Sequence, residues 1–342
     1  MQKVLKTYVS YLPGLVAALA IAAVARWLES LLPIHMIGAS VIAMFIGIVI
    51  NAIKKPTATF APGIKFTSKK VLKFAIILLG ASLNIMTILE VGKFSLAVMV
   101  FTLLTCFGVG HFTGKWLGLN WKMSNLISAG TGICGGSAIA AIAPVIDASD
   151  TDIAFGISAT FLFDMAMIVL FPIMGKALGL TDQAYGLWAG TAVNDTSSVV
   201  AAGYAFSEGA GDFATMVKLT RTLAIIPTVV IFALINLRLK RKAADGTDAK
   251  LQVNVGSIFP WFIVGFLAMA ALSSLGLIPA ELAAFLKSAS KFLMVAALAA
   301  IGLNTSFRDM RKVGLAPMLH GFIISALVVL VALGVEWVLG LV

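Results

Sequence analysis

Glycine and polar residues interrupt three apolar stretches of this chain, and chemistry is expected at these interruptions. The first runs from Ala129 to Ser137 and holds four glycines in seven residues. Glycines at that density break a helix and expose backbone N–H groups and carbonyl oxygens. The start of a half-helix favours an anion, and its carbonyl end favours a cation. The stretch therefore predicts an ion-binding site; the alternative is a small-residue packing face.

The second interruption is Asn194-Asp195-Thr196-Ser197-Ser198, near the middle of another apolar run. A carboxylate at membrane depth is a candidate carrier of a proton or a sodium ion, which predicts that role for Asp195. The alternative places residues 194–198 in a loop outside the membrane. Asp164 is a second carboxylate within an apolar run. It is either a titrating group or a structural partner of a neighbouring helix.

The third interruption contains two cations, Lys218 and Arg221, which lie three residues apart on one face of a predicted helix. They could hold an anion. Alternatively, they extend to the membrane interface or neutralise Asp195. Two smaller polar patches, at Asn84 and at Asn304-Thr305-Ser306, fit helix caps as well as they fit binding sites.

Composition requires that the elements carrying these residues face lipid. The chain has 342 residues, 60% of them apolar and 12% charged, whereas soluble domains are about 45–50% apolar and about 25% charged. The mean hydropathy is +1.04. Strands of a membrane barrel would alternate apolar and polar residues, and no such pattern is present. We expect an all-helical polytopic membrane protein.

Nucleic-acid binding, metals and cofactors are not expected. The net charge is +10, but the basic residues lie between apolar runs rather than on an aromatic-interleaved stripe. Cys106 and Cys134 lack the neighbours of a zinc site or a disulfide framework.

Eleven apolar runs are long enough to cross a bilayer. Alternate loops are rich in Lys and Arg, which predicts a cytoplasmic N-terminus and an external C-terminus in the bacterial inner (plasma) membrane. The first run also resembles a secretory signal, but Arg26 and ten further runs favour an uncleaved helix. The predicted spans are 11–30, 36–53, 71–89, 94–114, 124–146, 152–178, 183–206, 213–237, 257–276, 285–305 and 315–340.

One transmembrane domain, residues 1–342, is expected, with an extra N-terminal helix (1–35) and two repeats of five helices (36–180 and 181–342). Five is odd, so the repeats would be inverted, with breaks at the fifth and tenth spans. Residues 129–141 and 189–201 also align without gaps. In this topology those two spans run in the same direction, so their match is not the expected inverted pair.

The motifs resemble the sulfate exporter family of bacterial membrane proteins, the YeiH-like proteins. They are Gly130-Thr131-Gly132-Ile133-Cys134-Gly135-Gly136-Ser137-Ala138, Asn194-Asp195-Thr196-Ser197-Ser198, Val217-Lys218-Leu219-Thr220-Arg221 and residues 300–307. The resemblance covers nearly the whole chain. It implies the superfamily of sodium/proton antiporters and bile-acid sodium symporters, with inverted repeats, two crossed discontinuous helices, a moving core domain and a panel domain. Some antiporters place adjacent carboxylates after the first broken helix, where this chain has only Asp164.

The leading hypothesis is a secondary transporter of a small inorganic or organic anion, sulfate-like or sulfonate-like, coupled to a proton or sodium ion in the lipid bilayer. A homodimer is left open. Asp195 and Asp164 would bind the coupling ion, and loss of Arg221 should abolish transport while leaving the fold intact. The expected substrate-binding residues are Gly130, Thr131, Gly132, Cys134, Gly135, Gly136, Ser137, Asn194, Thr196, Ser197, Ser198, Lys218, Arg221, Asn304, Thr305 and Ser306.

A channel is an alternative to a carrier that saturable counterflow would distinguish, and two further rival functions remain. The first is a sodium/proton antiporter in which Lys218 or Arg221 balances Asp195. The second is a membrane-embedded enzyme with Cys134 or Ser137 as nucleophile, but no histidine is spaced as a recognisable base and no Walker-type or HExxH motif is present. A protein without enzymatic activity is therefore expected.

Overall fold

The computed structural model describes residues 2–31, 39–243, 260–305 and 314–342. All regular secondary structure in these ranges is helical, as expected. The elements are α1 (Gln2–Leu31), α2 (Ala39–Ile53), α3 (Ala61–Phe66), η1 (Thr67–Val71), α4 (Leu72–Leu79), η2 (Gly80–Ser82), α5 (Ile85–Trp116), α6 (Trp121–Gly132), α7 (Gly136–Ile142), α8 (Asp150–Ala177), α9 (Asp182–Ala192), α10 (Thr196–Phe206), α11 (Glu208–Thr222), α12 (Ile225–Ala243), α14 (Trp261–Ser274), α15 (Ala280–Asn304) and α17 (Leu315–Val338).

Several of these helices are long and apolar enough to cross a bilayer. Within the described ranges there are six such segments, and α2 and α14 are shorter apolar helices. Many large apolar side chains are exposed on the outside of the bundle, as a lipid-facing surface requires. The protein is therefore embedded in a membrane. The six segments are Ser10–Leu31, Ile85–Trp116, Thr151–Ala177, Glu208–Leu239, Ala280–Asn304 and Leu315–Val338.

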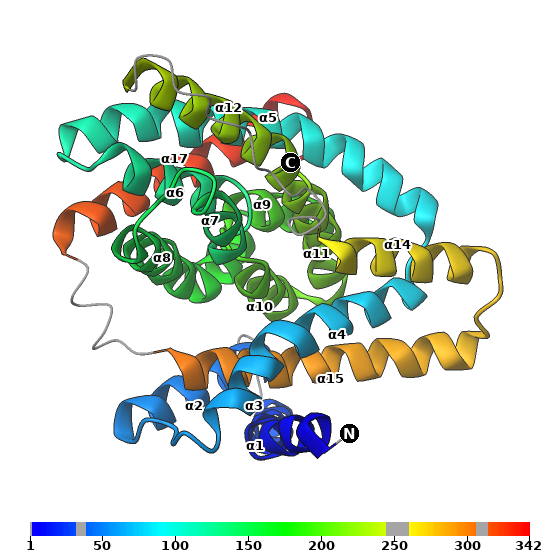
Figure 1. Cartoon of the computed structure of the whole chain (residues 1–342). Helices are drawn as coiled ribbons and strands as arrows, with labels where there is room; N and C mark the ends of the chain where they lie inside the picture. The colour runs from blue at the N-terminus through cyan, green and yellow to red at the C-terminus, as the bar shows by residue number, and fades with distance from the viewer. Residues whose placement is uncertain (1, 32–38, 244–259, 306–313) are drawn as a thin grey trace.

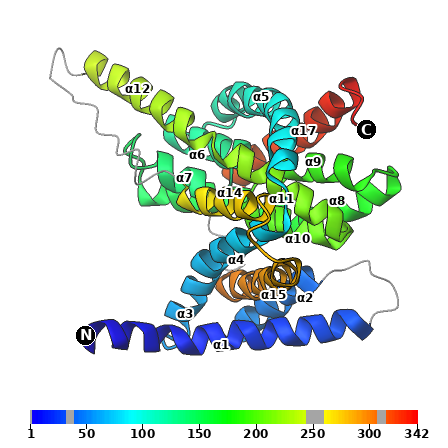
Figure 2. The ribbon, with the colours of Figure 1, turned by 90° about the vertical axis from the view of Figure 1, so that its right-hand side faces the viewer.

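The helices form two groups (Figures 1 and 2). We call α1 to α4, α14 and α15 the scaffold group, because α15 packs along α1, α2 and α4 while α14 packs on α4. We call α5 to α12 and α17 the hairpin group, because it contains two helical hairpins. In the scaffold group Gly47 and Gly302 let α2 and α15 cross with their backbones in contact, since a Cβ on either would meet backbone atoms of the other helix.

Helices α6 and α7 form a hairpin that enters and leaves at the same end of the molecule. Asn120 Nδ2, just before α6, donates to Asp152 Oδ1 at the start of α8 over 2.8 Å. Lys122 Nζ donates to the carbonyl oxygen of Asp147, which follows α7, over 2.6 Å. The chain therefore turns back at residues 133–135 instead of crossing.

Helices α9 and α10 form a second hairpin. Near the start of α9, the Tyr185 hydroxyl donates to Ala202 O in α10 over 2.9 Å. The ring of Tyr185 also stacks on that of Phe206 at the end of α10, with centroids 3.9 Å apart. Asp182 lies against Gly209 at the start of α11. The turn of this hairpin is at residues 193–195.

The two hairpins approach from opposite ends of α8. The first begins beside Asp152, near the start of this 28-residue helix. The second begins beside Phe171, whose ring contacts Tyr185 and Trp188. Midway along α8, the Asp164 carboxyl group bonds to the turn of the second hairpin. The tips therefore meet about halfway along a helix long enough to span a bilayer.

These hairpins correct several expectations. The break in the fifth predicted span is confirmed, but the fifth and seventh spans return to the end where they began, so eleven crossings do not fit. The expected break in the tenth span is wrong, because α15 is continuous over Ala280–Asn304. The third span, 71–89, is also wrong: Asn84 accepts the N–H of Met86 as the N-cap of α5, which begins a new helix there.

The hairpin topology can be tested by labelling single cysteines in membranes. We expect Lys115→Cys and Pro144→Cys, which flank the first hairpin, to react with an impermeant maleimide from the same side. Lys176→Cys, at the other end of α8, should react from the opposite side. All three positions are exposed, and the native Cys106 and Cys134 are buried, so their background is low. Reaction of Lys115→Cys and Pro144→Cys from opposite sides would contradict the hairpin.

Candidate functional site

The first hairpin tip depends on glycine. Gly135, which precedes α7, has a φ of 62°, a conformation that is strained for other residues. A Cβ added to Gly135 would lie 2.9 Å from Cβ and Oδ1 of Asp195, in the tip of the second hairpin. Glycine is therefore required here both by the backbone and by the direct contact of the two tips.

Two carboxylates satisfy the N–H groups of the second tip. Asp195 is the N-cap of α10, and its Oδ2 accepts the N–H of Ser197 over 2.9 Å and the Ser197 hydroxyl. Asp164, from α8, accepts the N–H of Asn194 at one oxygen and of Asp195 at the other, each over 2.8 Å. The sequence left the role of Asp164 open; in the structure both of its oxygens bond to the backbone of the second tip, and a role in ion binding stays a prediction.

Two cations satisfy the carbonyl oxygens at the ends of α6 and α9. Arg221 Nε and Nη2 donate to Gly132 O and Thr131 O, each over 2.7 Å, and its Nη1 donates to Thr191 O. Lys218 Nζ donates to Val193 O over 2.9 Å. Carbonyl oxygens at a helix end attract cations. One guanidinium group of α11 therefore bonds to both hairpins.

Close packing of α9 on α11 brings these cations to the tips. Gly186 and Gly190 are four residues apart and face Phe213 and Val217 of α11. A Cβ at either glycine would lie within 2.9 Å of those side chains. This spacing of small residues lets two helices approach closely. Lys218 and Arg221 follow directly on α11.

The four charged groups at the tips balance one another. Asp164, Lys218 and Arg221 have no exposed surface, whereas Asp195 is partly exposed. Buried charges are costly unless they are hydrogen-bonded and compensated, and both conditions are met here. Asp195 is the member of this cluster that a solute can reach directly.

The tips also contain polar atoms without partners. Thr131 Oγ1 and Asn194 Oδ1 are buried and make no hydrogen bond within the described structure. A buried polar atom without a hydrogen bond costs about 1–3 kcal/mol of folding free energy. Its presence therefore points to a solute or a water molecule that supplies the missing hydrogen bond. The exposed or partly exposed residues beside these atoms are Gly136, Ser137, Asp195 and Thr196.

Most of the residues predicted to bind substrate lie in the two tips or next to them. The hairpins and α11 bring together the stretch from Gly130 to Ser137, the stretch from Asn194 to Ser198, and the two cations. Asn304 and Thr305 instead lie at the end of α15 in the scaffold group, where the Thr305 hydroxyl bonds to Ile301 O. Ser306 lies outside the described residues.

Several alternatives from the sequence are now decided. Residues 194–198 are not an external loop, since Asn194, Ser197 and Ser198 are buried in the bundle. Lys218 and Arg221 do not extend to the interface, because both are fully buried. Their donors bond to backbone carbonyl oxygens, so an anion contact of either cation stays a prediction. Removal of Arg221 is no longer expected to leave the fold intact.

The nucleophile candidates of the enzyme alternative have different environments. Cys134 is buried and Ser137 is exposed. His320, in α17, hydrogen-bonds to Thr113 of α5 and to Ser124 of α6. Among the described residues, no hydrogen bond joins a histidine to Cys134 or Ser137. The geometry therefore adds nothing in favour of that alternative.

Two ion pairs, which the sequence did not suggest, connect the hairpin group to the scaffold group. Lys287 Nζ lies 2.7 Å from Asp212 Oδ2, and Lys291 Nζ lies 2.7 Å from Glu208 Oε1. The Tyr204 hydroxyl donates to Asp212 Oδ1 over 2.6 Å, and Lys291 lies over its ring. We call these five residues the clasp. Cationic residues one turn apart on α15 are the signal that sequence reasoning missed.

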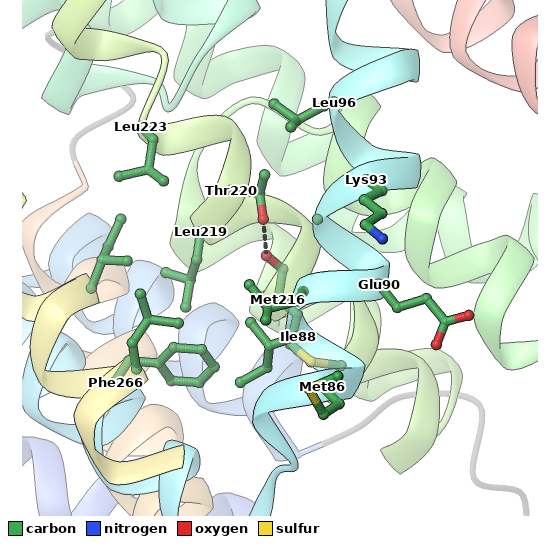
Figure 3. A pocket seen from close by; sticks show the side chains of 14 residues that line it. Met86, Ile88, Glu90, Lys93, Leu96, Met216, Leu219, Thr220, Leu223 and Phe266 are labelled. Atoms are coloured by element: carbon green, nitrogen blue, oxygen red, sulfur yellow. Dashed lines mark hydrogen bonds between the residues drawn. The ribbon is translucent and has the colours of Figure 1, made fainter. Parts of the chain in front are cut away.

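A cavity of about 690 Å³ lies between the two groups (Figure 3). Its walls come from α5 and α11 of the hairpin group and from α14 of the scaffold group. The lining is mainly apolar, with Glu90, Lys93 and Thr220 as polar residues. Thr220 adjoins Arg221 in α11, so the cavity runs along the outer face of the helix that holds the tips.

Known sequences place this chain in a family. The family model described as conserved hypothetical protein 698 matches residues 13–321. A UPF0324 membrane protein of Clostridium tetani is 54% identical over 337 residues, covering 96% of this chain and 98% of the relative. The chain belongs to the UPF0324 membrane protein family.

Other UPF0324 membrane proteins match over similar lengths. One from Streptococcus pyogenes serotype M6 is 38% identical and covers 98% of this chain and 100% of the relative. One from Fusobacterium nucleatum is 39% identical and covers 90% and 92%. These names record a membrane location, in agreement with the apolar helices. The hairpins and both tips lie within the residues that the family model matches.

Arg221 is expected to be a structural residue. In Arg221→Ala, carbonyl oxygens of Thr131, Gly132 and Thr191 lose a donor, so the protein should be destabilised by roughly 3 kcal/mol or more. Thermal unfolding of the purified protein in detergent measures this effect. Arg238→Ala, at an exposed site on α12, is the matched control and should unfold as the wild type does. Equal melting temperatures for all three proteins would contradict the capping role.

Neighbouring glycines in the first tip provide a second test. Gly135→Ala should destabilise the protein, because the new Cβ meets Asp195 and the backbone has a positive φ. At Gly136 an added Cβ would have its closest contact at 3.8 Å, with Ile157, so Gly136→Ala should be tolerated. Thermal unfolding compares the two. Unfolding of both variants at the wild-type temperature would contradict the contact between the tips.

Proposed function

We propose that this UPF0324 membrane protein is a secondary active transporter of a small anion that works by alternating access. The observation that carries the proposal is the meeting of two opposed hairpin tips halfway along α8. Irregular backbone at membrane depth is tolerated where it is buried in protein or lines a polar cavity, and transporters place substrate sites there. The unpartnered Thr131 Oγ1 and Asn194 Oδ1 mark that site.

The division into two helix groups supports relative movement. The clasp holds α15 to α10 and α11 near the end where the second hairpin begins. The cavity beside α14 lies at the boundary between the same groups. When the clasp is open, a solute would reach the tips from that end of the molecule. When the clasp is closed, a solute would reach them only from the opposite end. Of the four charged groups in the clasp, Glu208 is exposed to solvent, and water can compete for its ion pair with Lys291.

Charge at the tips favours an anion together with a proton. Asp195 places a carboxylate at the N-terminal end of α10, where the helix dipole favours negative charge. An anion that approaches this point is repelled by ionised Asp195 and accepted when Asp195 is protonated. Anion and proton would then move together. The hydroxyl groups of Ser137 and Thr196, which are at least partly exposed nearby, could donate to a sulfate-like or sulfonate-like anion.

The topology that follows differs from the sequence-based one at two loops. With both hairpins re-entrant, residues 143–149 lie on the same side as Lys115 and Lys122. We place this side, and the N-terminus, in the cytoplasm of a bacterial plasma membrane, because its loops carry most Lys and Arg residues. The inverted repeat is then the pair of hairpins, whose tips align with an offset of 60 residues.

A sodium/proton exchanger is the second candidate, favoured by one observation. Two acidic residues meet at the second tip, where the Asp164 carboxylate accepts the backbone N–H of Asp195 over 2.8 Å, and Asp195 is partly exposed. In that case cation flux would not require an anion. Both oxygens of Asp164 already accept backbone N–H groups, which leaves Asp195 as its exchanging residue.

Transport in proteoliposomes tests the proposal. Wild-type protein should show saturable counterflow of radiolabelled sulfate or methanesulfonate, stimulated by an inward proton gradient. Asp195→Asn removes the carboxyl group that would carry the proton, so it should retain exchange at equal pH and lose the stimulation. Asp182→Asn, at the exposed base of the second hairpin, is the matched control. Sodium-driven proton flux without any anion, abolished in Asp195→Asn, would replace the anion carrier with the exchanger.

A further inference from the structure

Glu336 is a buried carboxyl group that the tips do not use. It lies near the end of α17, has no exposed surface, and neither of its oxygens makes a hydrogen bond in the described structure. Among the described residues it is the only acidic side chain in this condition. An acidic residue in the last, most apolar segment therefore has no structural partner to explain it.

The surroundings of Glu336 connect it to the second hairpin. Helix α17 packs along α5, α8 and α9. Ser325 of α17 accepts a hydrogen bond from Asn194 Nδ2, over 3.3 Å, and Val329 O accepts one from Trp188 Nε1, over 2.9 Å. The hydroxyl group of Thr191 is the polar side chain that interacts with the Glu336 carboxyl group, at a geometry short of a hydrogen bond.

Charged side chains on the neighbouring helices make no hydrogen bond to Glu336 in the described structure. Asp164 of α8 bonds to the second tip, and Asp182 of α9 lies against Gly209. On α5, Glu90 and Lys93 line the cavity beside α14. On α6, Lys122 bonds to Asp147 O. Within the described residues, no cation therefore bonds to Glu336, and a negative charge there would be uncompensated.

Hydrogen-bond accounting then selects the form of the carboxyl group. The Thr191 hydroxyl donates its single hydrogen to Leu187 O over 2.7 Å. With that hydrogen engaged, neither oxygen of a Glu336 carboxylate has a hydrogen-bond donor in the described structure. Burying an uncompensated carboxylate is also costly. Both arguments favour a proton on Glu336 in this conformation.

We propose that Glu336 is a proton-binding site of the carrier, separate from Asp195. The site binds one proton when α17 and α9 are packed together, as here. Loss of the proton creates a buried charge without a donor, which favours separation of α17 from α9 and entry of water. The carbonyl oxygen of Thr191 accepts a hydrogen bond from Arg221, and Arg221 also bonds to Gly132 O in the first hairpin. A movement of Thr191 would therefore affect both hairpin tips. This coupling role rests on the proposed transport function, whereas proton binding itself does not.

Infrared spectroscopy of the full-length protein in lipid tests proton binding directly. At neutral pH the wild type should show the carbonyl-stretching band of a buried neutral carboxylic acid. Glu336→Gln should lack that band, and Glu90→Gln, at an exposed site on α5, should retain it. Thermal unfolding checks that all proteins are folded. An unchanged band in Glu336→Gln would overturn the proposal, because Glu336 would then be ionised in the folded protein.

Proteoliposomes with radiolabelled sulfate test the coupling role. Sulfate exchange at equal pH should be unchanged in Glu336→Gln, while uptake driven by a proton gradient should fall by about tenfold or more. Glu336→Asp should restore part of the driven uptake. Driven uptake equal to the wild type in Glu336→Gln would show that Glu336 is a buried acid without a coupling role.

The two experiments separate this inference from the function on which it rests. Absence of sulfate and methanesulfonate transport in the wild type would defeat the proposed function, yet the infrared band would still decide whether Glu336 holds a proton. A wild-type band that responds to sodium instead of pH would overturn the proton as the ligand.

Discussion

Backbone groups that leave a helix inside a membrane have no water to bond, so the protein itself must satisfy them. Both hairpin tips of this protein contain such groups. Arg221 and Lys218 supply the donors, and Asp164 supplies the acceptors. Because the same guanidinium group bonds to α6 and to α9, neither tip can move far without the other. The rest of the site depends on this shared cap.

The cap also determines what remains for a solute. Charges that looked free in the sequence are committed to backbone groups, and the cluster is neutral overall. Asp195 stays partly exposed, and among the described residues Thr131 Oγ1 and Asn194 Oδ1 are buried at the tips without a hydrogen-bond partner. A tightly bonded cage with one accessible carboxylate is better suited to move as a unit than to rearrange internally. Under the proposed function, such movement would occur at the clasp and the cavity, which lie at the boundary between the groups.

The similarity between residues 129–141 and 189–201 now has a structural explanation. Each stretch forms the turn of a hairpin, and the two turns approach each other from opposite ends of α8. In the sequence-based topology these stretches belong to two full crossings that run in the same direction, so their similarity does not fit an inverted repeat. As two opposed hairpins, the matching stretches are compatible with the inverted pair that we propose.

Composition and hydropathy by themselves determined the membrane setting and the all-helical fold, because lipid permits few other backbones. The glycine cluster predicted the break at Ile133 to Gly135, since local backbone preference is encoded locally. Asn84, a helix cap, was open to the same local reasoning.

Only the tertiary structure decided whether a broken helix continues or turns back. The short helix after the first break, α7, could either continue across the membrane or turn back, as far as its own sequence shows. Contacts between residues far apart in the sequence, such as Asn120 with Asp152, show that it turns back and forms the hairpin. Partners of buried charges were equally hidden, because Arg221 bonds to carbonyl oxygens 89 and 90 residues away. A side chain's type states what it can bond to, but packing determines which atoms lie within its reach.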